Sequence, residues 1–218
     1  MTTEPAAEQP ATDSILRQLL EGNRRFVTGN TIFAHESANW RQQLVGGQHP
    51  CATIVGCSDS RVPIELVFDQ GFGDLFVIRV AGNVMAPSVV GSLEYAVLHL
   101  RTPLVLVLGH EGCGAVTAAL EKLGGESHEP VGLDSLLALI TNGLRRYPLP
   151  QQPPAERLRA AVAANVRWSI EQIIGIPELQ PALQSGSVRV VGAIYDLKSG
   201  AVRLLDAPTE TKNSAVTV

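Results

Sequence analysis

Three short apolar segments of this chain show no alternation of polar and apolar residues. They are residues 52–56, 75–80 and 104–108, and each is rich in Val, Ile and Leu and bounded by turn residues. A strand with one face in water alternates polar and apolar residues, whereas a strand of a parallel sheet is covered on both faces and is apolar throughout. We therefore expect these segments to be strands of a buried, parallel sheet.

Helical patterns accompany these strands. Residues 88–100 lie between the second and third apolar segments and have the length and apolar spacing of a helix. A strand, a helix and a second strand in this order form a right-handed crossover, so the sequence predicts one α/β domain. Further helices are expected over residues 115–123, 133–144 and 158–173, and a closing hairpin over residues 188–194 and 201–205.

The N-terminal region divides into a leader and a helix. Residues 1–12 carry no basic segment followed by an apolar one, so they do not resemble a secretory signal, and we expect a disordered leader. Apolar residues then recur at helical spacing over residues 15–20, with Asp13 or Ser14 placed to cap the helix. Residues 13–218 are expected to form a single domain.

The composition argues against several kinds of partner. The chain of 218 residues carries 17 Lys and Arg against 21 Asp and Glu, and no run of basic residues. Nucleic acids and anionic membrane surfaces bind clustered basic residues, so we expect neither as a partner. The longest apolar run, residues 103–108, is too short to cross a bilayer. We expect a cytoplasmic protein whose three cysteines serve metal binding or catalysis before disulfides.

Two polar segments directly follow two of the predicted strands. Residues 57–61 read Cys-Ser-Asp-Ser-Arg, and residues 110–114 read His-Glu-Gly-Cys-Gly. The carboxyl ends of parallel strands gather at one edge of a sheet, and ligands bind in the crevice there. We therefore expect these segments to meet in space although they are about fifty residues apart in the chain.

The residue types in the two segments indicate zinc. Cys57, His110 and Cys113 offer two thiols and one imidazole, which suit this metal, and three protein ligands leave the fourth tetrahedral position to water, as in catalytic sites. The sequence predicts one zinc ion per chain. A disulfide or two plain buried cysteines are the alternatives, which the paired histidine disfavours. Cys51 opens a buried strand with no partner nearby and is interpreted as a core residue.

Asp59 and Arg61 lie two and four residues after the first cysteine of this set. A guanidinium group can hold a carboxylate by two parallel hydrogen bonds. Paired in this way, Asp59 is turned away from the metal and can accept a hydrogen bond from a zinc-bound hydroxide; unpaired, it could become a fourth ligand. The alternative is an ion pair that only braces the loop.

Together, Cys-x-Asp-x-Arg followed by His-x-x-Cys resembles the β-class carbonic anhydrases, and the similarity covers residues 15–205. The resemblance implies zinc on the two cysteines and the histidine, with Asp59 and Arg61 as an orienting and gating pair. It implies a mostly parallel sheet of about four strands with an added C-terminal edge strand, flanked by helices. It also implies a homodimer or a dimer of dimers, in which the N-terminal helix packs on the partner subunit.

Further positions match the plant-type pattern of that family. Gln48 matches the glutamine that hydrogen-bonds the substrate, with an ordinary loop residue as the alternative. Phe76, Ala81 and Tyr95 fall where the pattern has pocket residues, although it commonly has Val at the position of Ala81. These three are core residues in either interpretation.

The activity that the resemblance implies is the reversible hydration of carbon dioxide to bicarbonate and a proton by zinc-bound hydroxide, with a small molecule as the substrate. Two alternatives are a carbonyl sulfide or carbon disulfide hydrolase on the same scaffold, and a non-catalytic zinc-binding regulatory protein. The other four histidines are interpreted as surface or helix-face residues: His35, His49, His99 and His128.

Overall fold

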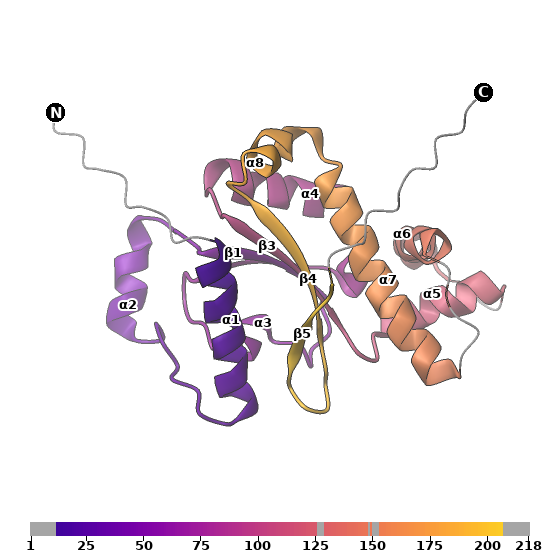
Figure 1. The fold of residues 1–218 in the computed structure, drawn as a ribbon, viewed down its shortest axis with the longest axis horizontal. Coiled ribbons are helices and arrows are strands. Elements are labelled where there is room, and N and C mark those ends of the chain that lie inside the picture. Colours follow the sequence, from indigo (N-terminus) through magenta and orange to yellow (C-terminus); the bar gives the residue numbers. More distant parts are fainter. Residues whose placement is uncertain (1–11, 126–128, 148, 150–152, 207–218) are drawn as a thin grey trace.

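A five-stranded sheet organises the residues that the structure, a computed structural model, describes: 12–125, 129–147, 149 and 153–206. The strand order is β2-β1-β3-β4-β5, of which Figure 1 labels the last four, and the first four strands of this order are parallel to one another. β5 runs antiparallel to β4, which confirms the predicted C-terminal edge strand. The strands are β1 (Ala52–Gly56), β2 (Leu75–Arg79), β3 (Leu104–His110), β4 (Arg189–Tyr195) and β5 (Val202–Leu204).

The central strand β3 is covered on both faces, as its unbroken apolar sequence predicts. Leu104, Leu106 and Leu108 point to the core that includes α1 (Thr12–Val27) and α3 (Ile64–Val67). Val105 and Val107 point to the opposite core, and all five side chains are fully buried. Because β3 is buried on both faces, its sequence lacks the alternating polar residues that a strand with one exposed face has.

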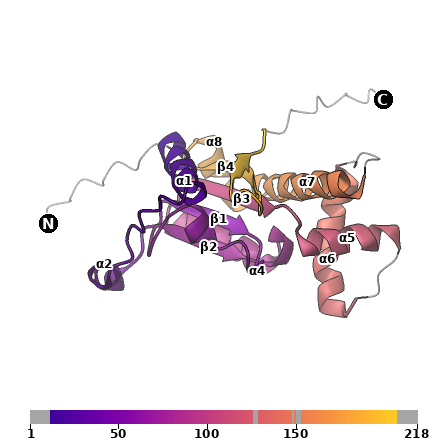
Figure 2. The same ribbon diagram turned by 90° about the horizontal axis from the view of Figure 1, so that it is seen from below.

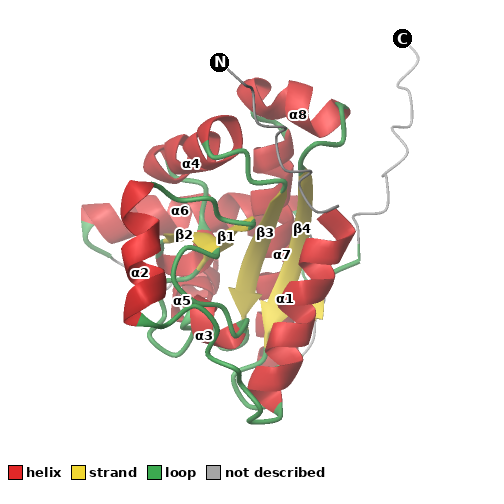
Figure 3. Cartoon of the chain, turned by 90° about the vertical axis from the view of Figure 1, so that its left-hand side faces the viewer, coloured by secondary structure: helices red, strands yellow, loops and turns green. Residues whose placement is uncertain are grey.

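The helices form two layers around the sheet. Figure 2 shows α1 above the strands and α4 below them, and Figure 3 shows β3 and β4 between α1 in front and α7 behind. At the far end of α7, α5 and α6 pack against it and against each other. The remaining helices are α2 (Ala38–Gln43), α4 (Pro87–Glu94), α5 (Gly114–Gly124), α6 (Val131–Arg146), α7 (Pro154–Ile174) and α8 (Gln180–Gln184).

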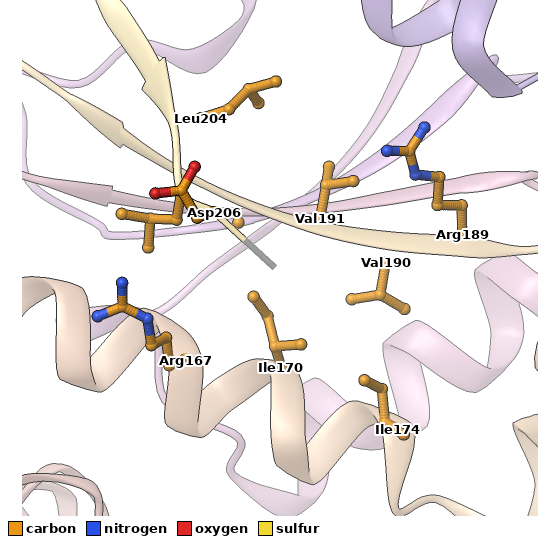
Figure 4. Close-up of a pocket in the computed structure, with 10 residues that line it drawn as sticks. Arg167, Ile170, Ile174, Arg189, Val190, Val191, Leu204 and Asp206 are labelled. Carbon is orange, nitrogen blue, oxygen red and sulfur yellow. The ribbon is translucent and has the colours of Figure 1, made fainter. Parts of the chain in front are cut away.

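Glycines let α7 lie directly on the sheet. A Cβ atom on Gly109 of β3 would lie 2.6 Å from Cγ2 of Val166, and one on Gly192 of β4 would lie 2.9 Å from Cγ1 of the same residue. Neither distance is compatible with a side chain at the glycine. Farther along α7, Ile170 faces β4 (Figure 4). The depth at which α7 sits is therefore fixed by two positions that carry no side chain.

Most predicted elements are present, with shifts at their ends. The helix expected over residues 88–100 begins at Pro87 and changes to a π-helical turn over Tyr95–His99. Asp13 and Ser14 lie inside α1 and do not cap it, and Thr12 is already helical. Residues 1–11 of the expected leader lie outside the described residues. The sequence did not predict α3 and α8, which are short helices of four and five residues.

The N-terminal helix packs on its own chain. Ile15, Leu16 and Leu19 are buried in the same core as the leucines of β3, and Asp13 forms an ion pair with Arg189 of β4. The predicted packing of this helix on a partner subunit stays a prediction. None of the helices within the described ranges has the length and apolar character that a bilayer crossing requires.

Replacement of Leu19 by alanine tests whether α1 belongs to the core of the single chain. Leu19 is fully buried, so Leu19→Ala should lower the free energy of unfolding by about 2–5 kcal/mol. Arg17→Ala, on the exposed side of the same helix, should change it by less than about 0.5 kcal/mol. Denaturant unfolding at one fixed chain concentration measures both. Equal stabilities of the two variants would contradict the packing described here.

Candidate metal centre

Three predicted ligands come together at the carboxyl ends of β1 and β3. Cys57 directly follows β1, His110 is the last residue of β3, and Cys113 immediately precedes α5. Their ligand atoms all lie within 4.8 Å of one another, and the two Sγ atoms are 4.0 Å apart. All three side chains are buried. The prediction that the two segments meet is confirmed.

The local fold explains this convergence. β1 and β3 are adjacent and parallel, with Gly56 in register with Leu108, so the residues that follow them leave the sheet side by side. Gly112 has a φ of 63°, a conformation that favours glycine, and it turns the chain from the strand back to Cys113. The cysteine then sits at the N-terminus of α5, where the helix dipole favours negative charge on sulfur.

His110 presents one nitrogen to the two sulfurs. Its Nδ1 lies 3.0 Å from the carbonyl oxygen of Glu111, and we assign the ring proton to Nδ1 because a carbonyl can only accept. Nε2 is buried and has no hydrogen-bond partner among the described residues. A buried acceptor without a partner is unfavourable. Coordination of a cation would satisfy this nitrogen.

The two thiols differ in how readily they lose their proton. Hydrogen bonds from the Cys113 thiol and from the Gly82 amide, 3.3 Å from Sγ, stabilise a thiolate on Cys57 and lower its pKa against the effect of burial. The adjacent thiolate and burial raise the pKa of Cys113. A divalent cation would displace this remaining proton, since zinc binds the deprotonated sulfur. Two sulfurs and one imidazole nitrogen, buried and converging, therefore fit a zinc ion.

Asp59 and Arg61 are paired beside this cluster. Arg61 donates from Nε to Oδ1 of Asp59 at 2.9 Å and from Nη2 to Oδ2 at 2.6 Å, and its amide also donates to Oδ1. These bonds to Arg61 hold the pKa of Asp59 well below its usual range. The paired oxygen Oδ2 is still only 3.8 Å from Nε2 of His110. An ionised carboxylate thus lies next to the ligand nitrogen of His110.

Arg79 is a residue that sequence reasoning missed. It ends β2, and its guanidinium donates to the carbonyl oxygens of Cys57 at 2.9 Å and Asp59 at 2.7 Å. It therefore holds the backbone that carries the first ligand and the carboxylate. A basic residue at the last position of an otherwise apolar strand was the signal that could have indicated it.

The remaining predicted site residues are not all near the cluster. Ala81 is next to it, because the amide of the following Gly82 bonds to the first cysteine. Phe76 and Tyr95 approach each other, with ring centroids 6.1 Å apart, and Gln48 is exposed on the loop before β1. Tyr95 is 47% exposed because it lies on the outer side of its helical turn, so its interpretation as a core residue is wrong. Within the described part of the chain, no hydrogen bond or ring contact joins these last three residues to the cluster. Their roles stay predictions.

The other cysteine and histidines are outside the cluster. Cys51 is half-buried against the α1 core, where burial and the charge of Asp74 raise the pKa of its thiol to about 11. Cys51 therefore packs against the core and outside the ligand cluster, as predicted, but it is only partly buried. His35, His49 and His99 are exposed, as predicted. His128 lies outside the described residues.

A separate pocket lies at the other end of β4. It has a volume of about 280 Å³ and lies between α7, β4 and β5 (Figure 4). One of its arginines, Arg189, is the partner of Asp13. The predicted site residues are not among those that line it. The metal centre is instead at the carboxyl end of β3, where His110 pairs in register with Tyr195.

Comparison with known proteins identifies the family. The carbonic anhydrase family model matches residues 52–202, which include both ligand segments. The solved structure of the β-carbonic anhydrase CafA of Aspergillus fumigatus superposes with a TM-score of 0.72 at 29% identity, over 90% of this chain and 91% of that one. This chain belongs to the β-carbonic anhydrase family.

Bacterial relatives of this β-carbonic anhydrase cover nearly its whole length. It is 40% identical to carbonic anhydrase 2 of Mycobacterium tuberculosis, over 87% of this chain and 91% of the relative. It is 37% identical to the carbonic anhydrase of Mycolicibacterium smegmatis, over 86% and 90% of the two chains. The structure of a β-carbonic anhydrase from Coccomyxa, solved with acetazolamide, superposes with a TM-score of 0.70 at 26% identity, over 87% of this chain and 86% of that one.

The three ligand atoms predict which cysteines are required for zinc binding. The native β-carbonic anhydrase should contain one zinc ion per chain by elemental analysis. Cys57→Ser and Cys113→Ser each remove one of only three ligands, so both should contain far less than one zinc ion per chain. Cys51→Ser is the matched control, because its thiol lies in the core away from the cluster. A full zinc content in Cys57→Ser would contradict the assignment of this ligand.

Proposed function

We propose that Cys57, His110 and Cys113 hold the zinc ion with which this β-carbonic anhydrase catalyses the reversible hydration of carbon dioxide to bicarbonate and a proton. The observation that carries the proposal is the buried Nε2 of His110, which has no hydrogen-bond partner among the described residues and lies beside two converging sulfurs. Membership of the carbonic anhydrase family supports the reaction, and the donor set supports the metal.

Zinc, when bound by these three ligands, supplies a Lewis acid that makes hydroxide available near neutral pH. The protein must then orient the attacking oxygen. Asp59 is ionised and therefore can only accept a hydrogen bond, so it would orient a hydroxyl group held beside it by accepting that group's hydrogen. Arg61 fixes the carboxylate in place for that purpose.

An assembly of two or four subunits fits the remaining predicted residues. Tyr95 and Leu98 lie in the same helical turn and expose 47% and 46% of their surface, which a second subunit would cover. Among the described residues, no hydrogen bond or ring contact joins Phe76, Tyr95 or Gln48 to the cluster, and a role for them at a metal centre would be met across such a contact. The solved relatives include two tetrameric β-carbonic anhydrases from Sordaria macrospora. We propose a homodimer or a dimer of dimers.

Free thiols support a cytoplasmic location. Cys51, Cys57 and Cys113 form no disulfide, and reduced cysteines are the rule in the cytoplasm.

The match to the plant-type pattern at Gln48, Phe76, Ala81 and Tyr95 supports assignment to that subgroup and a substrate role for these residues.

Two substitutions test the role of the ion pair beside the ligands. Asp59→Asn replaces a pure acceptor by a group that also donates, and Arg61→Ala frees the carboxylate, so each should lower kcat/KM for carbon dioxide by about 10–100-fold with zinc content unchanged. Stopped-flow pH-indicator assays measure the rates. Arg146→Ala is the control, because it breaks a comparable exposed ion pair with Glu171 away from the site. Native rates in both site variants would favour the purely bracing interpretation.

Substrate choice is tested on one zinc-loaded sample. Proton release from carbon dioxide should be fast, sulfide release from carbonyl sulfide and carbon disulfide should be slow, and Cys57→Ser should abolish both. The sulfide-releasing hydrolase and the regulatory zinc protein each predict a different result in these assays. Rapid sulfide release with negligible proton release from carbon dioxide would establish the hydrolase, and no turnover of either substrate by the zinc-loaded protein would establish the regulatory protein.

A further inference from the structure

Helix α7 carries a buried polar pair that the reaction as described does not use. Asn165 and Ser169 lie one helical turn apart and are 1% and 0% exposed. Asn165 Nδ2 donates to the carbonyl oxygen of Gly82 in the loop that follows β2, at 2.7 Å. The single hydroxyl hydrogen of Ser169 is shared between the carbonyl oxygens of Asn83 in that loop, at 3.0 Å, and of Asn165, at 3.1 Å. This pair therefore fixes two successive carbonyl groups of one loop.

The same loop reaches the proposed zinc ligand. The amide of Gly82 donates to Sγ of Cys57 at 3.3 Å, so two hydrogen bonds in series connect Asn165 to this sulfur through one residue. Gly82 has a φ of 69°, and an added Cβ would lie 2.6 Å from Cδ1 of Ile140 and 3.2 Å from Cβ of Ala115. Side chains of α5 and α6 thus pack closely against Gly82, and Asn165 of α7 bonds to its carbonyl oxygen.

The position of Asn165 is itself fixed. The next residue, Val166, lies against Gly109 and Gly192, where no side chain could be accommodated. Gly109 immediately precedes His110 in β3. The same turn of α7 therefore contacts the strand that carries the histidine ligand and bonds to the loop that contacts the cysteine ligand.

The unpaired atoms of this region argue against a purely packing role. Asn165 Oδ1 and Asn83 Nδ2 are buried without a hydrogen-bond partner among the described residues. An unsatisfied buried polar atom is unfavourable. A leucine of similar size at position 165 would remove the unpaired Oδ1 but would leave the carbonyl oxygen of Gly82 without its donor. The side-chain bond that Asn165 makes is therefore the one to Gly82, and its oxygen stays unpaired among the described residues.

We propose that Asn165 is a positioning residue for zinc: through Gly82 it directs an amide hydrogen bond onto the sulfur of Cys57, and thereby sets the direction and donor strength of that ligand. The inference rests on the proposed function, because it takes Cys57 to be a zinc ligand. Partners of this kind orient metal ligands in general, and their loss typically weakens metal binding by about 10–100-fold.

The test replaces Asn165 by leucine, which has a similar volume and no donor. Asn165→Leu should bind zinc about tenfold more weakly in competition with a chromophoric chelator, and its cobalt(II) form should show altered sulfur-to-metal and ligand-field absorption bands. Thr102→Val is the matched control, because it removes an equally buried hydroxyl group whose bonds go to Thr53 and Ala96. The control should keep the native affinity and spectrum.

The cobalt spectrum decides the outcome, because general destabilisation can weaken metal binding without changing the coordination. A spectrum altered in Asn165→Leu but not in Thr102→Val supports the proposal, and a native spectrum in both overturns it whatever the affinities are. If Cys57→Ser retains zinc, the ligand assignment itself fails. If Cys57→Ser loses zinc while Asn165→Leu has the native spectrum, only the present inference fails.

A measurement on the native chain covers the case in which Asn165→Leu does not fold. In the cadmium-113 form, a scalar coupling between the metal and the Gly82 amide proton, relayed through Sγ of Cys57, supports the proposal. A Gly82 amide proton that exchanges with solvent at an unprotected rate overturns it, because a proton held in a buried hydrogen bond exchanges slowly.

Discussion

The mutual burial of two sulfurs and one imidazole nitrogen is the constraint on which the rest of the site depends. Cys57 and Cys113 place their sulfurs 4.0 Å apart, one as a favoured thiolate and the other with its proton retained. Nε2 of His110 adds a lone pair that no described residue satisfies. Such a group is costly without a cation and favourable with one, so metal binding and the stability of this edge of the sheet are coupled.

Around these three ligand atoms, different residues hold the ligand backbone and orient the reacting oxygen. Backbone groups near the ligands are held by donors from other elements: Arg79 holds the carbonyl of Cys57, and Asn165 holds the carbonyl of Gly82. The charged pair of Asp59 and Arg61 lies on the more exposed side, where the side chain of Arg61 is 57% exposed. Ligand geometry is therefore set from the interior, whereas the group that orients the reacting oxygen is reached from the solvent side.

Much of this arrangement could be predicted from local patterns. The unbroken apolar sequence of β3 indicated burial on both faces, and the structure has Leu104 facing one core and Val105 the other. The ligand set could be predicted for a similar reason, because residues that directly follow parallel strands must meet at one edge of the sheet. Gln48 and Tyr95 were assigned from a family pattern alone, and nothing in the backbone of one chain brings them to the metal centre.

The sequence by itself determined the parallel sheet, its C-terminal edge strand and the three ligands, because each depends on residues adjacent in the chain or on strand ends that the topology must bring together. Only the tertiary structure decided that α1 packs on its own sheet, that Nε2 of His110 faces the sulfurs, and that Asn165 reaches Gly82. The last contact spans 83 residues. It depends on how deeply α7 settles over two glycines of the sheet, and packing depth has no signature in the local order of residues.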